Sequence, residues 1–216
     1  MIMNILIIAA HPDDEILGMG GTIYKLRKEG HKIYLCIVTD GKCDTCGLKD
    51  RHEKRKKSAL KASKFLGIHG VHFLNFPDMK LDIIPQIEIN KKLEELIKKI
   101  KPEIVYTVPD NDFHQDHKKV LECTLVVTRP HSSNVKAVYM YEMPESTKMG
   151  FNPNVYVNIE KEFNYKIKAF KMYTTEQQNF PFPRSLKGIE SLAIQRGIES
   201  GLKKAEAFKL IRKIEK

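Results

Sequence analysis

The sequence predicts an α/β protein with a mostly parallel sheet and helices on both faces, formed as one domain over residues 1–216. Short apolar runs typical of buried strands alternate with longer segments in which apolar residues recur at helical spacing. Such repeated alternation is typical of Rossmann-like architectures, in which ligands bind beyond the carboxyl ends of the strands. A chain of 216 residues with 42% hydrophobic content buries roughly 70% of its unfolded surface and is most simply one domain.

Each expected element follows from its local pattern. The apolar runs predict strands at residues 4–10, 33–40, 71–76, 103–108, 135–142 and 154–159. Helical spacing predicts helices at residues 15–28, 51–66, 87–100, a segment after His117, 160–173 and 185–199. The first of these helices has Ile16, Met19, Ile23 and Leu26 on one face. Residues 144–154 and the Pro-rich residues 179–185 are predicted loops, and each could close over a site.

The net charge of the chain and the composition of its first residues indicate which binding partners and which cellular location to expect. A net charge of +10 would suit a nucleic acid or an anionic membrane, but the lysines are spread along the chain and alternate with apolar residues at helical spacing. We therefore interpret the lysines as solvated faces of helices and expect no nucleic-acid partner. An acidic or phosphorylated substrate remains an alternative explanation of the positive charge. No stretch approaches a membrane span, and residues 1–10 lack the basic start of a signal peptide. A cytoplasmic protein is expected.

The four cysteines are too few and too scattered for a secreted disulfide framework. Cys36 and Cys123 lie in apolar contexts where cysteine behaves as a small hydrophobic residue. Cys43 and Cys46 have the spacing of a redox pair or of half a zinc knuckle. The sequence offers no second pair to complete such a site, so a plain loop is favoured.

Polar residues follow three of the predicted strands at the point where each strand ends. They are residues 10–15 (AHPDDE), 39–41 (TDG) and 108–117 (VPDNDFHQDH). Carboxyl ends of parallel strands meet at one edge of the sheet, so these residues are expected to converge. Burying charge costs several kcal/mol unless the charge is paired or bound to a metal. The cluster therefore predicts a cation site or a chemical function.

Two pairs of residues have the same i, i+3 spacing. One pair is His11 with Asp14, and the other is His114 with His117. Two histidines and one carboxylate make a catalytic zinc set that leaves one position open for water, although spacing alone does not decide which candidates are ligands. Taken singly, His11 would suit a helix cap and the HxxH pair a surface helix face. Together, at two strand ends of one sheet, they favour a metal.

The glycines after this cluster resemble a dinucleotide fingerprint only in part. Gly18 and Gly20 fit it, but Ile23 stands where the third glycine is needed. We expect these glycines to allow close packing of the first helix on the sheet.

The combination of AHPDDE with HQDH resembles the zinc-dependent de-N-acetylases of the PIG-L/LmbE-like group, which includes N-acetylglucosaminyl deacetylases. These two motifs are specific for the group when they occur together. Supporting similarities extend along nearly the whole chain, at residues 10–23, 38–41, 55–68, 166–177 and 196–208.

The resemblance implies a metal bound by His11, Asp14 and His117, with Asp13 as the general base. Zinc is the expected ion, and another divalent metal would also serve. The chemistry agrees, because zinc lowers the pKa of bound water toward about 7 and a neighbouring carboxylate that is not a ligand can take the proton.

The resemblance also implies residues that contact the substrate. His114 is expected to face the substrate carbonyl, protonated and paired with Asp116, and so to stabilise the oxyanion. Arg55 is expected to contact the sugar, with Arg51 and His52 as competitors. The chain departs from common members at Ser58, where an acid is usual, and in the loop that carries the cysteine pair. Both departures concern substrate contacts and not the metal centre.

The sequence thus predicts a zinc hydrolase that removes acetyl from an N-acetylglucosamine-type sugar or sugar conjugate, releasing acetate and a free amine. Its expected partner is this small molecule, and a homo-oligomer is left open. One alternative is hydrolysis of another amide or ester by the same residues. The other is a basic nucleic-acid-associated protein with a structural metal, which is disfavoured because structural zinc sites are closed and rich in cysteine.

Overall fold

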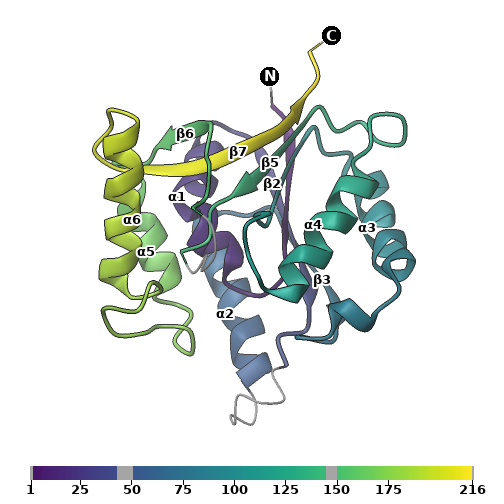
Figure 1. Cartoon of the computed structure of the whole chain (residues 1–216), viewed down its shortest axis with the longest axis horizontal. Coiled ribbons are helices and arrows are strands. Elements are labelled where there is room, and N and C mark those ends of the chain that lie inside the picture. The colour runs from purple at the N-terminus through teal and green to yellow at the C-terminus, as the bar shows by residue number, and fades with distance from the viewer. Residues whose placement is uncertain (1, 43–50, 145–149, 216) are drawn as a thin grey trace.

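The computed structural model describes residues 2–42, 51–144 and 150–215, which form a seven-stranded sheet enclosed by helices (Figure 1). The strands are β1 (Asn4–Ala9), β2 (Lys32–Thr39), β3 (Gly70–Phe76), β4 (Ile104–Thr107), β5 (Ala137–Tyr141), β6 (Val155–Asn158) and β7 (Ala205–Lys213). The helices are α1 (Asp14–Lys28), α2 (Arg51–Leu66), a short 3-10 turn η1 (Leu81–Ile83), α3 (Gln86–Ile100), α4 (Gln115–Val127), α5 (Phe163–Phe170) and α6 (Leu186–Glu199).

The sheet has the order β3-β2-β1-β4-β5-β7-β6. The strands from β3 to β5 run parallel, while β7 runs antiparallel between β5 and β6. The predicted α/β class with a mostly parallel sheet is confirmed. The sequence did not predict β7, because its apolar residues alternate with charged ones and its second half is only partly buried.

Helices cover both faces of the sheet, as predicted. Figure 1 shows α3 and α4 on one side, and α1, α2 and α5 on the other. The central strand β1 is completely buried from Ile5 to Ala9, as expected for a parallel strand covered on both faces. Its carboxyl end therefore delivers the next residues into a largely enclosed region.

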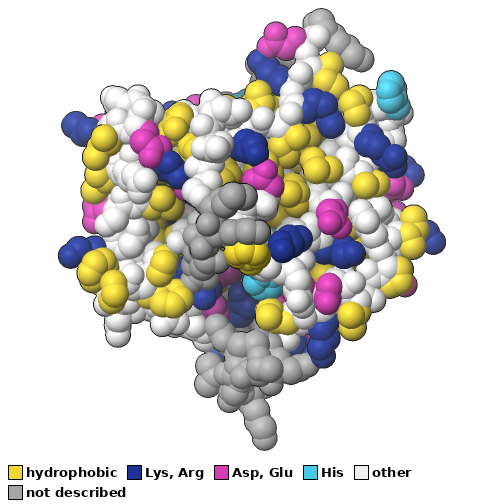
Figure 2. All heavy atoms as spheres, viewed as in Figure 1, with side chains coloured by type: hydrophobic (Ala, Val, Ile, Leu, Met, Phe, Trp, Pro, Cys, Tyr) yellow, Lys and Arg dark blue, Asp and Glu magenta, His cyan; other side chains and the backbone are white. Residues whose placement is uncertain are grey.

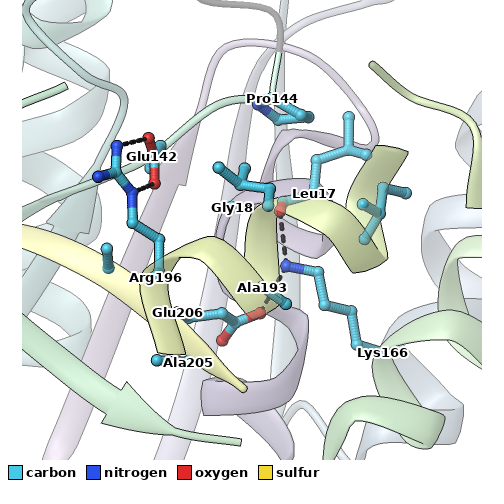
Figure 3. Close-up of a pocket in the computed structure, with 12 residues that line it drawn as sticks. Leu17, Gly18, Glu142, Pro144, Lys166, Ala193, Arg196, Ala205 and Glu206 are labelled. Atoms are coloured by element: carbon cyan, nitrogen blue, oxygen red, sulfur yellow. Dashed lines mark hydrogen bonds and ion pairs between the residues drawn. The ribbon is translucent and has the colours of Figure 1, made fainter. Parts of the chain in front are cut away.

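Helix α1 is kinked near its start, and buried charges hold the two parts together. Met19 has a non-helical backbone (φ −146°, ψ 24°). The Lys166 ammonium donates to the Leu17 carbonyl and to the Glu206 carboxylate, both at 2.7 Å (Figure 3). Glu206 also accepts the backbone N–H of Gly21 at 3.0 Å. The polar backbone groups freed by the kink thus find buried partners.

The glycines of α1 allow close packing, as the sequence predicts. A Cβ at Gly18 would overlap the ring of Tyr141 in β5, and one at Gly21 would lie only 2.9 Å from Ile159. The helix can therefore approach the sheet only without side chains at these positions.

Many basic side chains lie on the surface. On the face shown in Figure 2 they form no single patch, because Lys and Arg are scattered among apolar and acidic side chains. Within the described ranges, no helix combines the length and the apolarity that crossing a bilayer requires.

Candidate metal centre and active site

The site lies where the chain order of the sheet reverses, between β1 and β4, which is the usual ligand position in this architecture. The turn from β1 into α1 supplies His11 and Asp14, and the start of α4 supplies His114 and His117. The sequence predicts a helix after His117, but α4 begins at Gln115 with His114 as its N-cap. His117 therefore lies in the first turn of α4, with its direction set by the helix.

Three donor atoms form a small triangle. His11 Nδ1 lies 3.2 Å from His117 Nε2 and 3.7 Å from Asp14 Oδ2, and the third side, from His117 Nε2 to Asp14 Oδ2, measures 3.5 Å. A tetrahedral zinc ion with bonds of about 2.0–2.1 Å places its donors about 3.3–3.4 Å apart. The triangle therefore has the size that one such ion requires, and all three side chains are buried.

The other ring nitrogens of both histidines face carboxylates. His11 Nε2 lies 3.0 Å from Asp116 Oδ2 and 3.0 Å from Asp78 Oδ1. His117 Nδ1 lies 2.7 Å from Asp112 Oδ2. Because a carboxylate accepts, these outer nitrogens carry the protons and donate. In the neutral tautomers, the lone pairs of His11 Nδ1 and His117 Nε2 then point at one another.

The donor set therefore fits a divalent cation. Two ring lone pairs and a carboxylate oxygen converge, and only a positive charge between them removes their mutual repulsion. The pKa of His117 also indicates that this site favours positive charge. Burial alone would lower this pKa, but the carboxylates of Asp14 and Asp112 outweigh burial and raise it to about 9.

Asp13 lies beside the donor triangle but points elsewhere. Its carboxylate oxygens lie 3.2 Å from Arg55 Nη2 and 3.4 Å from Arg184 Nη1. Burial raises the pKa of Asp13 to about 7, against the opposing effect of the Arg55 charge. A carboxylate with a pKa near neutrality is suited to accept and release a proton.

Arg55 is enclosed by acidic groups. Besides Asp13, its guanidinium lies 3.6 Å from Asp78 Oδ2 and 3.3 Å from Glu176 Oε1, and only 6% of the residue is exposed. These contacts hold Asp13 and Asp78 in place, while contact of Arg55 with a sugar stays a prediction. The side chain of its competitor Arg51 lies outside the described residues, as do Cys43 and Cys46.

The expected pairing of Asp116 with His114 needs correction. The Asp116 carboxylate faces His11 and accepts the backbone N–H groups of Met79 at 2.8 Å and Leu81 at 3.0 Å. Its link to His114 is through the backbone, because the Asp116 N–H donates to His114 Nδ1 at 3.2 Å. The first turn of α4 directs the carboxylate toward η1 and β1, so Asp116 orients the candidate ligand His11 instead.

The expected protonation of His114 also needs correction. Burial, followed by the positive charges of His11 and His117, lowers the pKa of His114 to about 4. The ring is therefore neutral near pH 7. Because Nδ1 accepts from a backbone N–H, the neutral ring carries its proton on Nε2 and remains a hydrogen-bond donor.

Several residues of the site were not singled out from the sequence. Their common task is to hold a predicted site residue in place, and they come from loops and helix ends scattered along the chain. They are Glu15, Asp78, Asp112, Tyr173, Glu176 and Arg184. Glu15 and Asp112 lie in segments that the sequence predicts to converge, but they received no role there. Asp78 follows the end of β3, so the same argument could have found it, whereas no sequence signal marked Arg184 beyond its predicted loop.

Known proteins resemble this chain in sequence. The profile of the PIG-L family, described as GlcNAc-PI de-N-acetylase, matches residues 6–128, which is more than half of the chain. The uncharacterized deacetylase YaiS of Escherichia coli (strain K12) is 37% identical over 176 residues, covering 79% of this chain and 90% of that protein. The chain belongs to the PIG-L family.

Other relatives agree with this PIG-L assignment. Diacetylchitobiose deacetylase of Thermococcus kodakarensis is 25% identical over 226 residues, covering 97% of this chain and 84% of that protein. The structure of N,N'-diacetylchitobiose deacetylase from Pyrococcus horikoshii has a TM-score of 0.82 at 21% identity, over 97% of this chain and 84% of that one, and shows the same fold. The predicted family and the predicted deacetylase class are confirmed.

Proposed function

We propose that this PIG-L deacetylase hydrolyses the acetamido group of an N-acetylglucosamine-type sugar or sugar conjugate with the help of a zinc ion. The observation that carries the proposal is the buried His11, Asp14 and His117 triangle, with the carboxylate of Asp13 beside it but outside it. The relative from Thermococcus kodakarensis, named a diacetylchitobiose deacetylase, supports this class of substrate.

His11, Asp14 and His117 would hold the metal. When bound, a divalent cation supplies an acidified water, with its pKa near about 7, and a Lewis-acidic contact for the amide carbonyl. Zinc suits two imidazoles and one carboxylate, and the same donors would accept another divalent ion. Asp116, Asp78 and Asp112 would keep the two imidazoles in the tautomers that metal binding needs.

Asp13 would act as the general base. It accepts the proton from the water that attacks the amide carbon, and it then delivers this proton to the departing nitrogen, so that acetate and a free amine form. The guanidinium groups of Arg55 and Arg184 hold the carboxylate during both transfers. Each oxygen has one such partner and retains lone-pair capacity for the reacting proton.

His114 would stabilise the oxyanion as a neutral donor through Nε2–H. The Asp116 backbone N–H fixes this tautomer from the other side of the ring. A positioned donor of this kind is typically worth 10²–10³ in turnover, that is about 3–4 kcal/mol. Phe113, which precedes His114 and is 48% exposed, is a proposed aromatic contact for the sugar ring. We keep Arg55 as a proposed sugar contact.

Acetate release from a panel of N-acetylated sugars and conjugates tests this proposal. Asp13→Asn keeps the size of the side chain but cannot accept the proton, so we expect metal content to be retained while turnover falls at least about a hundredfold. Asp110→Asn, in the loop before α4 but paired with the exposed Lys209, is the matched control and should keep parental turnover.

The outcomes separate the alternatives. Undiminished turnover in Asp13→Asn would remove Asp13 from the mechanism. A parent protein that releases no acetate but cleaves other amides or esters would move the reaction to another substrate class. Salt-dependent binding of nucleic acid without any hydrolysis would favour the structural-metal alternative.

A further inference from the structure

Glu15 is a buried carboxyl group to which the proposed reaction assigns no task. The residue is completely buried in the first turn of α1. One of its oxygens, Oε2, accepts the backbone N–H of Asp13 at 3.2 Å. The other, Oε1, accepts the hydroxyl of Tyr173 at 2.5 Å, and Tyr173 is also completely buried. A chain of two hydrogen bonds thus runs from the segment after α5 to the backbone of Asp13.

The backbone that this chain holds is in an unusual conformation. Asp13 has φ 125° and ψ −24°, in the region that side-chain-bearing residues rarely adopt. Such a conformation costs about 1–3 kcal/mol and persists only where surrounding contacts enforce it. Among such contacts, the Glu15 carboxylate is the one that binds the Asp13 backbone N–H.

The unusual turn has a visible effect on neighbouring side chains. Asp14 points toward His11 and His117. Asp13, directly before it, points toward Arg55 and Arg184. An ordinary helical or extended backbone at residue 13 would change the direction of its carboxylate relative to the donor triangle. The strained turn therefore separates the candidate base from the candidate ligand.

We propose that Glu15 and Tyr173 are positioning residues that hold Asp13 in this strained turn, so that its carboxylate faces the reacting water. The catalytic part of this statement rests on the function proposed above, with Asp13 as base. Arg184 and Arg55 contact the side chain of Asp13, and Arg55 also donates to the Pro12 carbonyl at 3.2 Å, on the other side of the same peptide unit. The Asp13 N–H itself is held by Glu15, so the arginines do not replace this anchor.

Kinetics of four variants test the proposal. Glu15→Leu removes the acceptor for the Asp13 N–H, and a misplaced base should lower kcat about a hundredfold, with KM within about twofold and metal content unchanged. Glu15→Gln retains a carbonyl oxygen that can accept this N–H, so its kcat should fall only about threefold. Tyr173→Phe removes the donor that holds Glu15, and an intermediate loss of about tenfold in kcat is expected.

Tyr141→Phe is the matched control. Tyr141 is equally buried, and its hydroxyl donates to the Ile8 carbonyl at 3.3 Å rather than to Glu15. Removing this hydroxyl also deletes a buried hydrogen bond, a longer one than that of Tyr173, in a chain of contacts that does not include Asp13. We expect its kcat to stay within about twofold of the parent value. Equal losses in Tyr141→Phe and Tyr173→Phe, or in Glu15→Gln and Glu15→Leu, would overturn the proposal.

Hydrogen exchange at the Asp13 amide gives a readout that needs no substrate. Followed by NMR on the full chain, exchange should be at least about tenfold faster in Glu15→Leu and near parental in Glu15→Gln. Unchanged protection in Glu15→Leu would refute the backbone anchor. If protection is lost in Glu15→Leu but the parent protein releases no acetate, the anchor stands and the proposed function is refuted.

Discussion

Replacement of Asp112 is the sharpest test of how the metal centre is built. Asp112 Oδ2 lies 2.7 Å from His117 Nδ1, and Asp112 Oδ1 accepts the backbone N–H of His114 at 2.9 Å. The carboxylate thus fixes both the tautomer of His117 and the start of α4. Without it, the imidazole can rotate or place its proton on the nitrogen that must bind the metal.

The magnitude follows from this single contact. Loss of a carboxylate that orients a ligating histidine typically weakens metal binding 10–100-fold, and each factor of ten is about 1.4 kcal/mol. For Asp112→Ala we therefore expect zinc affinity to fall by about 1.4–2.8 kcal/mol. Asp112→Asn keeps an oxygen that can accept from Nδ1 but loses the charge, so its loss should be smaller.

The assay is a titration of metal-free protein with zinc in the presence of a chromophoric chelator, at one fixed pH because protons compete with the metal. Asp110→Ala is the matched control, since Asp110 lies in the same loop but pairs with Lys209 at the surface. A zinc affinity of Asp112→Ala within about twofold of the parent would refute the reasoning. An equal loss in Asp110→Ala would assign the effect to the loop rather than to His117.

Three further outcomes are expected. His117→Ala should lose stoichiometric zinc while His114→Ala keeps most of it, as measured by elemental analysis; equal loss in both would contradict the ligand assignment. Chelation should destabilise the protein, and zinc at about 100 times its Kd should restore about 2.7 kcal/mol in urea unfolding; unfolding indifferent to zinc would argue against a metal here. Lys166→Met leaves Glu206 buried without its cation and should cost about 3–5 kcal/mol, whereas Lys203→Met, at the surface, should leave urea unfolding close to parental. Similar midpoints for these two variants would show that the buried pair does not stabilise the fold.

Most of the parallel sheet could be predicted because its inner strands are largely buried and rich in apolar residues, while the edge strand β3 is only half-buried. The run of β1 is the clearest example, with full burial from Ile5 to Ala9. Strand β7 could not be found in this way. It lies between β5 and β6 and is half exposed, so charged residues alternate with apolar ones, and its pairing depends on contacts distant in sequence.

The composition of the site was predictable, but the direction of its side chains was not. Strand ends and equal spacing predicted that the histidines of both pairs would converge with Asp14, and the family resemblance implied His11, Asp14 and His117 as the ligands, whose donor atoms the structure brings together. The family resemblance implied that Asp116 would pair with His114. In the structure its carboxylate accepts two backbone N–H groups next to η1 and faces His11. Such a choice depends on how a loop packs, and spacing carries no information about it.

The two halves of the chain contribute differently to the site. The donors of the proposed metal centre all lie within residues 6–128, the part that matches the PIG-L profile. The contacts that aim Asp13 come partly from beyond it, through Tyr173 to Glu15 and through Arg184 directly. Placement of the proposed metal ligands and of the proposed base thus depends on partly different contacts, which meet at Asp78, 3.0 Å from His11 Nε2 and 3.6 Å from Arg55 Nη1. Changes to Tyr173 or Arg184 should lower turnover while the donor triangle stays intact, because the histidines of the triangle are held by Asp78, Asp112 and Asp116.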